Sequence, residues 1–150
     1  MKYLIIAFIA ILTIASCNKN EKIENEDFLI FGHFFGECGG EGCVEIFKIE
    51  DGELFEDTLD QYPSATGNNY SWQKLDDDLY QQAKDLVDLF PDELLNENEI
   101  TIGMPDAGDW GGIVVGTKSR VWLVDYADEN IPNYLSEFTA EIKERITILQ

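Results

Sequence analysis

Cationic side chains are scarce in this chain. Its 150 residues contain 10 Lys and Arg against 30 Asp and Glu, which gives a formal net charge of −20 at pH 7. Binding to nucleic-acid phosphates requires a high density of Lys and Arg, so this deficit argues against a nucleic-acid partner. It also argues against electrostatic adsorption to anionic lipid headgroups. A strongly acidic protein attracts basic partners or divalent cations instead, although the same charge also serves solubility.

Residues that commonly carry catalysis or bind metals are also few. His33 is the only histidine, and the chain has three cysteines. It contains no Gly-x-Ser-x-Gly motif, and the glycine-containing segment 103–112 lacks the Gly-Lys-Ser/Thr ending of a phosphate-binding loop. The many carboxylates offer many pairs of the kind that glycoside hydrolases use, but nothing singles out one pair. The sequence therefore indicates no particular reaction, and we expect neither a cofactor nor a resident metal.

The amino-terminal segment is the most informative part of the chain. Lys2 precedes an almost unbroken apolar run over 3–13, and two small residues then lead directly into Cys17. This layout is typical of a secretory signal peptide, and the run is shorter than the roughly 20 residues of a transmembrane helix. Ile14-Ala15-Ser16-Cys17 resembles the lipobox of bacterial lipoproteins. The alternative is an anchor helix that is not cleaved.

The lipobox resemblance implies cleavage before Cys17 and attachment of diacylglycerol to its thiol. It divides the chain into a signal peptide over 1–16, the lipidated cysteine with a flexible polar tether over 17–27, and one domain over 28–150. Each buried methylene adds about 0.8 kcal/mol of membrane affinity, so several acyl chains anchor a domain firmly. We expect an exported protein held on the cell membrane or outer membrane, facing the periplasm or the surface.

Two further cysteines lie in the predicted domain. Cys38 and Cys43 flank the glycine-rich centre of a predicted hairpin, and cysteines separated by four residues in an exported domain indicate a disulfide. The alternatives are a redox dithiol, or a metal site that adds His33 and either Glu37 or Glu41. The C-x4-C spacing differs from the C-x2-C of redox motifs and zinc knuckles, which favours the disulfide.

Hydrophobic patterning predicts an α+β fold in the order β-β-β-α-β-β-β-α. The six predicted strands cover 28–31, 44–49, 53–56, 100–102, 113–115 and 121–126. The first helix follows the helical spacing of apolar residues from Leu75 to Phe90, and the second runs from Leu135 to Leu149, with Asn130 as its expected N-cap. Residues 61–73 are predicted to be a connecting loop. Tight turns favour antiparallel pairing, so we expect an antiparallel sheet of about six strands with two helices packed on one face.

His33 is a candidate ligand-binding residue. Alternation along the predicted strand places it on one face with Phe31 and Phe35. A lone histidine between two aromatic rings is more often a packed, hydrogen-bonded residue than a base. A hydrolytic triad would also require an activated Ser or Cys beside it.

The loop over 103–112, with the sequence GMPDAGDWGG, is the most distinctive internal segment. Asp106 and Asp109 could ligate Ca²⁺ together with backbone carbonyls, although they do not match the EF-hand pattern, and Asp106 could equally close a turn. Trp110 lies beside them, and Trp72 lies in the other predicted loop. Aromatic side chains in loops are preferred anchors of interfaces; the alternative is that they cover the edge of the core.

Several segments resemble a family of small lipoproteins from Bacteroidetes-type bacteria. They are FGHFFGEC at 31–38, CVEIF at 43–47, PDAGDWGG at 105–112 and IPNYL at 131–135. The resemblance covers most of the predicted domain. It implies a lipid-anchored location and no activity, because none is assigned to the family. Its members often have cysteine where this chain has Ala107, a departure that argues against a metal site or second disulfide in this loop.

The function hypotheses follow from the anchor and the charge. The first is a binding module that contacts a protein or envelope component through the hairpin tip and the 103–112 loop. A sharper version is an inhibitor or immunity-like protein against a basic cell-wall hydrolase, because opposite charge speeds encounter. The alternatives are a hydrolase that uses Asp106 and Asp109, and a purely structural envelope lipoprotein.

Overall fold

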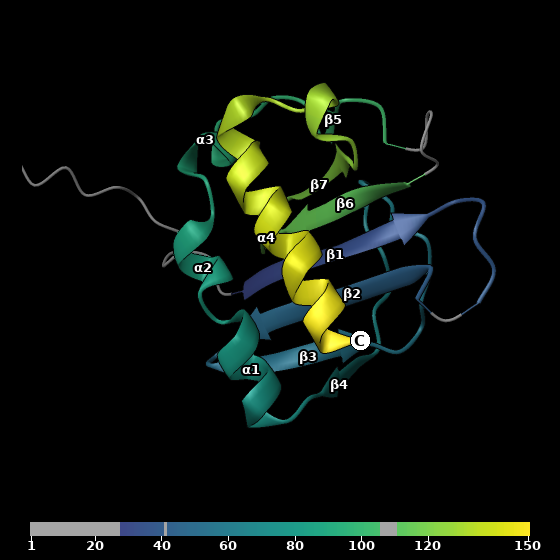
Figure 1. Cartoon of the computed structure of the whole chain (residues 1–150), viewed down its shortest axis with the longest axis vertical. Helices are drawn as coiled ribbons and strands as arrows, with labels where there is room; N and C mark the ends of the chain where they lie inside the picture. The colour runs from purple at the N-terminus through teal and green to yellow at the C-terminus, as the bar shows by residue number, and fades with distance from the viewer. Residues whose placement is uncertain (1–27, 41, 106–110) are drawn as a thin grey trace, which may run out of the picture.

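The structure is a computed structural model that describes residues 28–40, 42–105 and 111–150. Within these ranges the chain has an α+β fold, in which one mixed sheet of seven strands carries helices on one face (Figure 1). The predicted signal peptide and tether lie outside the described residues. In the part that the structure describes, none of the helices combines the length and the apolar character needed to cross a bilayer.

The helices and strands follow one another along the chain with short connections, apart from the long segment between β3 and β4. They are β1 (Phe28–Phe35), β2 (Val44–Glu50), β3 (Glu53–Asp57), β4 (Trp72–Lys74), α1 (Asp77–Ala83), α2 (Leu86–Leu89), α3 (Asp92–Leu95), β5 (Thr101–Ile102), β6 (Gly111–Gly116), β7 (Val121–Asp125), a 3₁₀ turn η2 (Asp128–Asn130) and α4 (Asn133–Leu149).

In space the strands lie in the order β4-β3-β2-β1-β6-β7-β5. The predicted meander of the first three strands is confirmed, because β1 pairs with β2 and β2 with β3 in antiparallel register. β6 then adds to the free side of β1, and β7 pairs with β6. The sheet is mixed rather than purely antiparallel, since β5 lies on the outer side of β7 and runs parallel to it.

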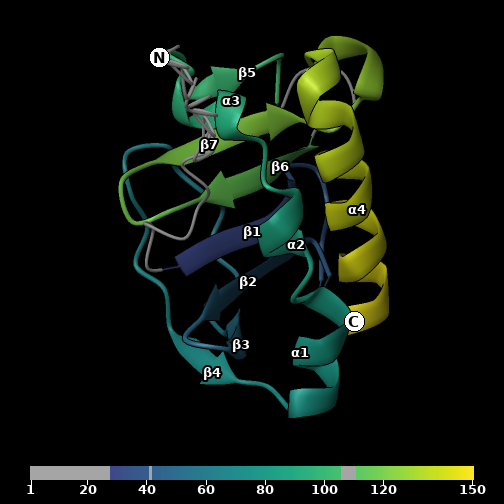
Figure 2. The same cartoon turned by 90° about the vertical axis from the view of Figure 1, so that its left-hand side faces the viewer.

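The two faces of the sheet are covered differently (Figure 2). The helices cover the face that holds the larger core, where Phe31 and Phe47 stack with ring centroids 5.6 Å apart and Phe138 of α4 is buried. The opposite face holds a smaller cluster that includes Phe34 and Ile46, and Tyr62 of the 58–71 segment packs edge-on against Phe34 at 5.0 Å. β6 is buried along its whole length, as its continuous apolar sequence predicts.

The predicted helix over 75–90 is broken into two shorter helices. α1 ends at Ala83 and α2 begins at Leu86, and both of these side chains are completely buried. At the break, the carboxylate of Asp85 lies 3.1 Å from the guanidinium of Arg145 in α4. Helices this short are marginal alone, so packing against α4 stabilises them.

Two other expectations are wrong in detail. Trp72 to Lys74 form an edge strand paired with β3, not the end of a loop. Asn130 is not the N-cap of α4, because the helix begins at Asn133 after Pro132. The Asn130 amide instead donates to the buried carboxylate of Asp125 at 3.1 Å, and that carboxylate also accepts the backbone N–H groups of Met104 and Ala127.

Gly32 provides a test of the packing in the middle of β1. A Cβ atom added there would lie 2.2 Å from the carbonyl oxygen of Glu45 and 2.8 Å from Cα of Ile46, both in β2. We predict that Gly32→Ala lowers the free energy of unfolding by about 2–3 kcal/mol, because the strands must separate to admit the methyl group. Urea denaturation measures the change.

Gly39→Ala is the matched control, because a Cβ at Gly39 would meet no heavy atom within 4 Å. We expect its free energy of unfolding to stay within about 0.5 kcal/mol of the unchanged protein. Equal stability of the two variants would contradict the close approach of β1 and β2.

Candidate functional site

The register of the sheet brings two of the predicted segments together. Phe35, the last residue of β1, pairs with Gly111, the first residue of β6. The hairpin tip over 36–43 and the end of the 103–112 loop therefore meet at one end of the sheet (Figure 1). Phe35 also donates its backbone N–H to the carbonyl oxygen of Cys43 at 2.9 Å, which closes the hairpin just before the tip.

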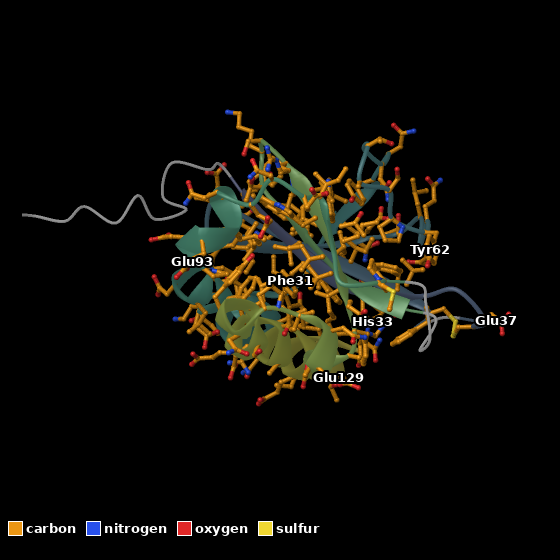
Figure 3. All side chains as sticks on the ribbon, turned by 90° about the horizontal axis from the view of Figure 1, so that it is seen from above. Phe31, His33, Glu37, Tyr62, Glu93 and Glu129 are labelled. Atoms are coloured by element: carbon orange, nitrogen blue, oxygen red, sulfur yellow. A yellow bond between two sulfur atoms is a disulfide. The ribbon has the colours of Figure 1, made fainter. Side chains whose placement is uncertain are left out.

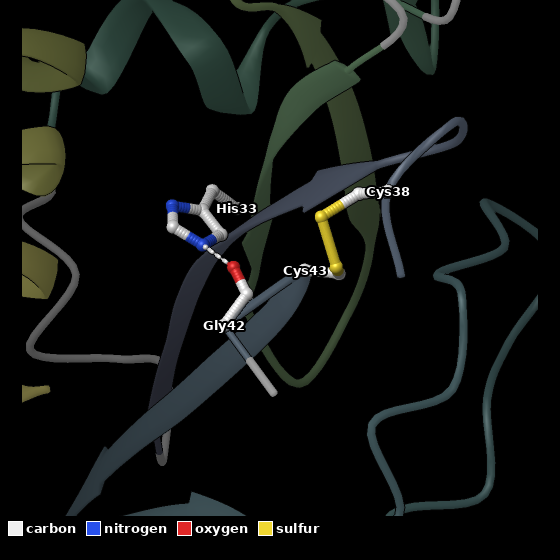
Figure 4. Close-up of a disulfide and its surroundings, with 4 residues drawn as sticks. All are labelled: His33, Cys38, Gly42 and Cys43. Atoms are coloured by element: carbon white, nitrogen blue, oxygen red, sulfur yellow. Dashed lines mark hydrogen bonds between the residues drawn. A yellow bond between two sulfur atoms is a disulfide. The ribbon is translucent and has the colours of Figure 1, made fainter. Parts of the chain in front are cut away.

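The disulfide between Cys38 and Cys43 is confirmed (Figure 4). The two Cα atoms lie 5.6 Å apart, so the bond closes the tip directly beyond the last paired residues. Because both sulfurs are used in this bond, neither serves as a redox dithiol or a metal ligand in this oxidised form. Among the described residues, no group of three or more His, Cys, Asp or Glu side chains is arranged to hold a metal ion.

His33 is buried beneath the tip, with 9% of its surface exposed. Its Nε2 donates to the carbonyl oxygen of Gly42 at 3.0 Å (Figure 4), and its ring lies 4.9 Å from that of Phe35. Burial lowers the pKa of His33 below the ordinary 6.5, and the bond to Gly42 opposes this shift only in part. A lowered pKa favours the uncharged form of His33, in which the ring still donates to the backbone of the tip.

An aromatic row extends from His33 across the end of the sheet. The Phe35 ring lies 5.1 Å from that of Tyr126, which follows β7. Lys143 of α4 places its ammonium 4.5 Å from the Tyr126 ring and donates to the Tyr126 carbonyl oxygen and to Asp128, both at 2.7 Å. Sequence reasoning missed Tyr126 and Lys143, because only the packing of α4 on the sheet places them together.

Carboxylates surround this row. Glu37 lies at the tip and Glu129 in the 3₁₀ turn; in Figure 3, Glu37 lies beyond His33 at the right-hand edge of the molecule, and Glu129 lies below His33. Both side chains are exposed. We call this area the hairpin-end surface and define it by Phe35, Glu37, Tyr126, Asp128 and Glu129. A rigid aromatic centre with a charged rim is the arrangement found in protein interfaces.

The other predicted aromatic residue does not join this surface. Trp72 lies on the opposite face of the sheet, half-buried, stacked on Tyr70 at 4.8 Å. Its ring lies 5.1 Å from the ammonium of Lys48, which the Phe55 ring also contacts at 4.9 Å. Trp72 therefore covers a buried cation and the edge of the smaller core. This is the alternative to a role as an interface anchor that the sequence left open.

The remaining candidates lie outside the described residues. They are Cys17, Glu41, Asp106, Asp109 and Trp110. Ca²⁺ binding by the 103–112 loop and hydrolysis by its two aspartates therefore stay sequence predictions. Comparison of the chain with protein-family models, with curated proteins and with solved structures finds no match.

The lowered pKa of His33 predicts a pH dependence of stability. Below the ordinary pKa of 6.5, the unfolded chain binds a proton that the folded chain resists, so protonation favours unfolding. We predict that the free energy of unfolding falls as the pH decreases from 6.5 through the pKa of the folded protein. The slope of this single group is at most about 1.4 kcal/mol per pH unit.

His33→Gln is the matched variant, because its amide can still donate to the Gly42 carbonyl but does not titrate. Urea unfolding between pH 5 and pH 7 should give a smaller slope for this variant, while the carboxylates contribute equally to both proteins. An NMR titration that places the pKa of His33 at or above 6.5 would contradict the prediction.

Proposed function

We propose that this protein is an acidic lipoprotein of the cell envelope that binds a basic protein through its hairpin-end surface. The proposed location is supported by the sequence, in which the apolar leader ends at Ile14-Ala15-Ser16-Cys17. The single observation that carries the binding proposal is the pairing of Phe35 with Gly111. This register gathers the disulfide-closed tip, the end of the 103–112 loop and the segment after β7 at one end.

The chemistry of the hairpin-end surface supports a cationic partner. Phe35 and Tyr126 offer apolar area held in place by ring contacts, which lowers the entropy lost on binding. Lys143, whose ammonium lies beside Tyr126, is already paired with Asp128. Exposed Glu37 and Glu129 are then available as rim charges, and the net charge of −20 steers a basic protein toward the molecule.

A basic cell-wall hydrolase is the partner class that best matches this combination. Such an enzyme works in the same compartment as an exported, lipid-anchored protein. Its positive surface complements the acidic rim, and complementary charge mainly raises the association rate. The protein would then act as an inhibitor or immunity-like protein, protecting the wall near the membrane that carries it.

The anchor is tested by replacing the cysteine that ends the leader. We predict that the unchanged protein fractionates with membranes and that its mature form begins at an acylated Cys17, as measured by mass spectrometry. Cys17→Ser should remove the acyl chains and prevent stable membrane association, because each buried methylene contributes about 0.8 kcal/mol. An unchanged protein that keeps residues 1–16 and carries no lipid would contradict the proposal.

Binding is tested by charge reversal at matched positions. We predict that basic lysozyme associates with the protein at low salt, and that the double variant Glu37→Lys/Glu129→Lys lowers the association rate about tenfold or more. The control is Glu93→Lys/Glu99→Lys, which changes the net charge equally. Both control residues are exposed, and Glu93 lies far from His33 in Figure 3.

Biolayer interferometry at low and high NaCl measures these rates. The control variant should lower the association rate only two- to threefold, through the overall charge, and high salt should weaken all binding. Equal effects of the two double variants, or absence of binding at both salt concentrations, would contradict the proposed surface.

A further inference from the structure

A cleft of about 420 Å³ opens at the other end of the sheet, away from the hairpin-end surface. Its lining comes from the start of β1, the turn between β2 and β3, and the α1–α2 segment. These elements are distant in sequence, but the start of β1 and the end of β2 pair directly, because Phe28 lies opposite Glu50. The volume falls within the range of sites that hold small ligands.

The lining of the cleft is apolar inside and acidic at the entrance. Leu29 and Ile49, with 1% and 6% of their surfaces exposed, and the half-buried Val87 contribute aliphatic side chains. Asp51 and Asp88 also line the cleft, and both are exposed. The cleft therefore offers an apolar wall to one part of a ligand and carboxylates to another.

Two other carboxylates that line the cleft are already paired. Glu50 binds the Lys48 ammonium at 2.5 Å, and Asp85 binds the Arg145 guanidinium at 3.1 Å. Asp51 and Asp88, by contrast, make no ion pair within the described ranges 28–40, 42–105 and 111–150.

Among the described residues, Lys84 is the cation that lines the cleft, and its side chain is directed toward α1. The ammonium of Lys84 donates to the side-chain oxygen of Gln81 at 2.6 Å, and the side chain is exposed. It lowers the negative potential of the cleft, but it supplies no partner to either free aspartate. The charge that remains unmatched at the entrance is therefore negative.

We propose that this cleft binds a primary ammonium group carried on a short aliphatic chain, as in a lysine side chain or a free alkylamine. The aliphatic chain lies against Leu29, Ile49 and Val87, and the ammonium lies between the carboxylates of Asp51 and Asp88. An ammonium has three donors, so it can serve both carboxylates at once. A neutral alkyl ligand leaves the carboxylates unpaired, and an anion is repelled.

The substitutions that test the proposal leave the fold intact. Asp51 has φ of 52° and precedes Gly52 with φ of 79°, so the two residues form the tight turn between β2 and β3. Asparagine adopts this left-handed conformation as readily as aspartate, so Asp51→Asn removes the charge and keeps the turn. Asp88 is exposed in α2, where Asp88→Asn is also tolerated.

The experiment is an NMR titration of the whole protein with pentylamine, followed through the methyl signals of Leu29 and Val87. We expect saturable shifts of these methyl signals in the unchanged protein. The dissociation constant for pentylamine should be at least about tenfold larger in Asp51→Asn/Asp88→Asn. The matched control Glu93→Gln/Glu99→Gln loses the same charge outside the cleft and should bind nearly as the unchanged protein does. Lys84→Gln, which removes the opposing cation, should tighten binding two- to threefold.

Ligand variants separate the two halves of the site. Pentanol, which has the same chain without the charge, should give no saturable shift. Shortening the amine should weaken binding by up to about fourfold for each methylene lost from the apolar wall. A tripeptide that contains lysine separates the two sources of the ammonium group, with the norleucine tripeptide as its uncharged control. If the lysine peptide binds as tightly as pentylamine and the norleucine peptide does not bind, the natural ligand is a lysine side chain of a protein. If the lysine peptide binds more weakly than pentylamine, the natural ligand is a free amine.

The proposal is overturned if millimolar pentylamine leaves the Leu29 and Val87 methyls unshifted, or if Asp51→Asn/Asp88→Asn binds pentylamine as the unchanged protein does. These outcomes are independent of the hairpin-end surface, which lies at the other end of β1 and β2. Glu37→Lys/Glu129→Lys should leave the pentylamine affinity within about twofold, since neither residue lines the cleft and salt screens exposed charges that are not in contact with the ligand.

Discussion

The central strand β1 is the constraint on which the other parts of this structure depend. It pairs with β2 on one side and with β6 on the other, and the side chains between its two ends are buried on both faces. A strand in this position has no free edge and no solvated face, so its register determines where every neighbouring segment lies. Gly32 in its middle has the carbonyl of Glu45 so close that no side chain fits.

Both candidate surfaces lie at the ends of this strand. Its last residues, His33 and Phe35, support the disulfide-closed tip and contact Tyr126. Its first residues, Phe28 and Leu29, line the cleft beside the β2–β3 turn. The middle of the strand, over 30–34, is too buried to contact a partner, so it acts as a rigid support that holds the two surfaces at its ends apart. Binding residues placed on loops over a rigid sheet are a common arrangement in proteins.

The negative charge of the chain is distributed unevenly around this support. The segment 75–100, which forms α1 to α3, contains nine Asp and Glu and a single lysine. Two of the cations in the described part of the chain are used within the fold: Arg145 joins α4 to the break between α1 and α2, and Lys48 is buried among aromatic rings. Most of the carboxylates among the described residues are exposed, where they attract basic molecules.

Patterns that depend on near neighbours were predictable from the chain. The β-type runs over 28–31 and 44–49, together with the glycine-rich tip and the flanking cysteines, predicted the hairpin and its disulfide, because strand pairing across a short loop is a local event. The edge strand β4, the parallel position of β5 and the helix break at Asp85 were not predictable, because each depends on a partner distant in sequence. The same distinction applies to the two candidate surfaces. Composition and spacing in the sequence identified His33 and the hairpin tip. The tertiary structure alone decided the contacts of Tyr126 with Phe35 and Lys143 and the cleft between α2 and the start of β1, because they exist only once the helices pack on the sheet.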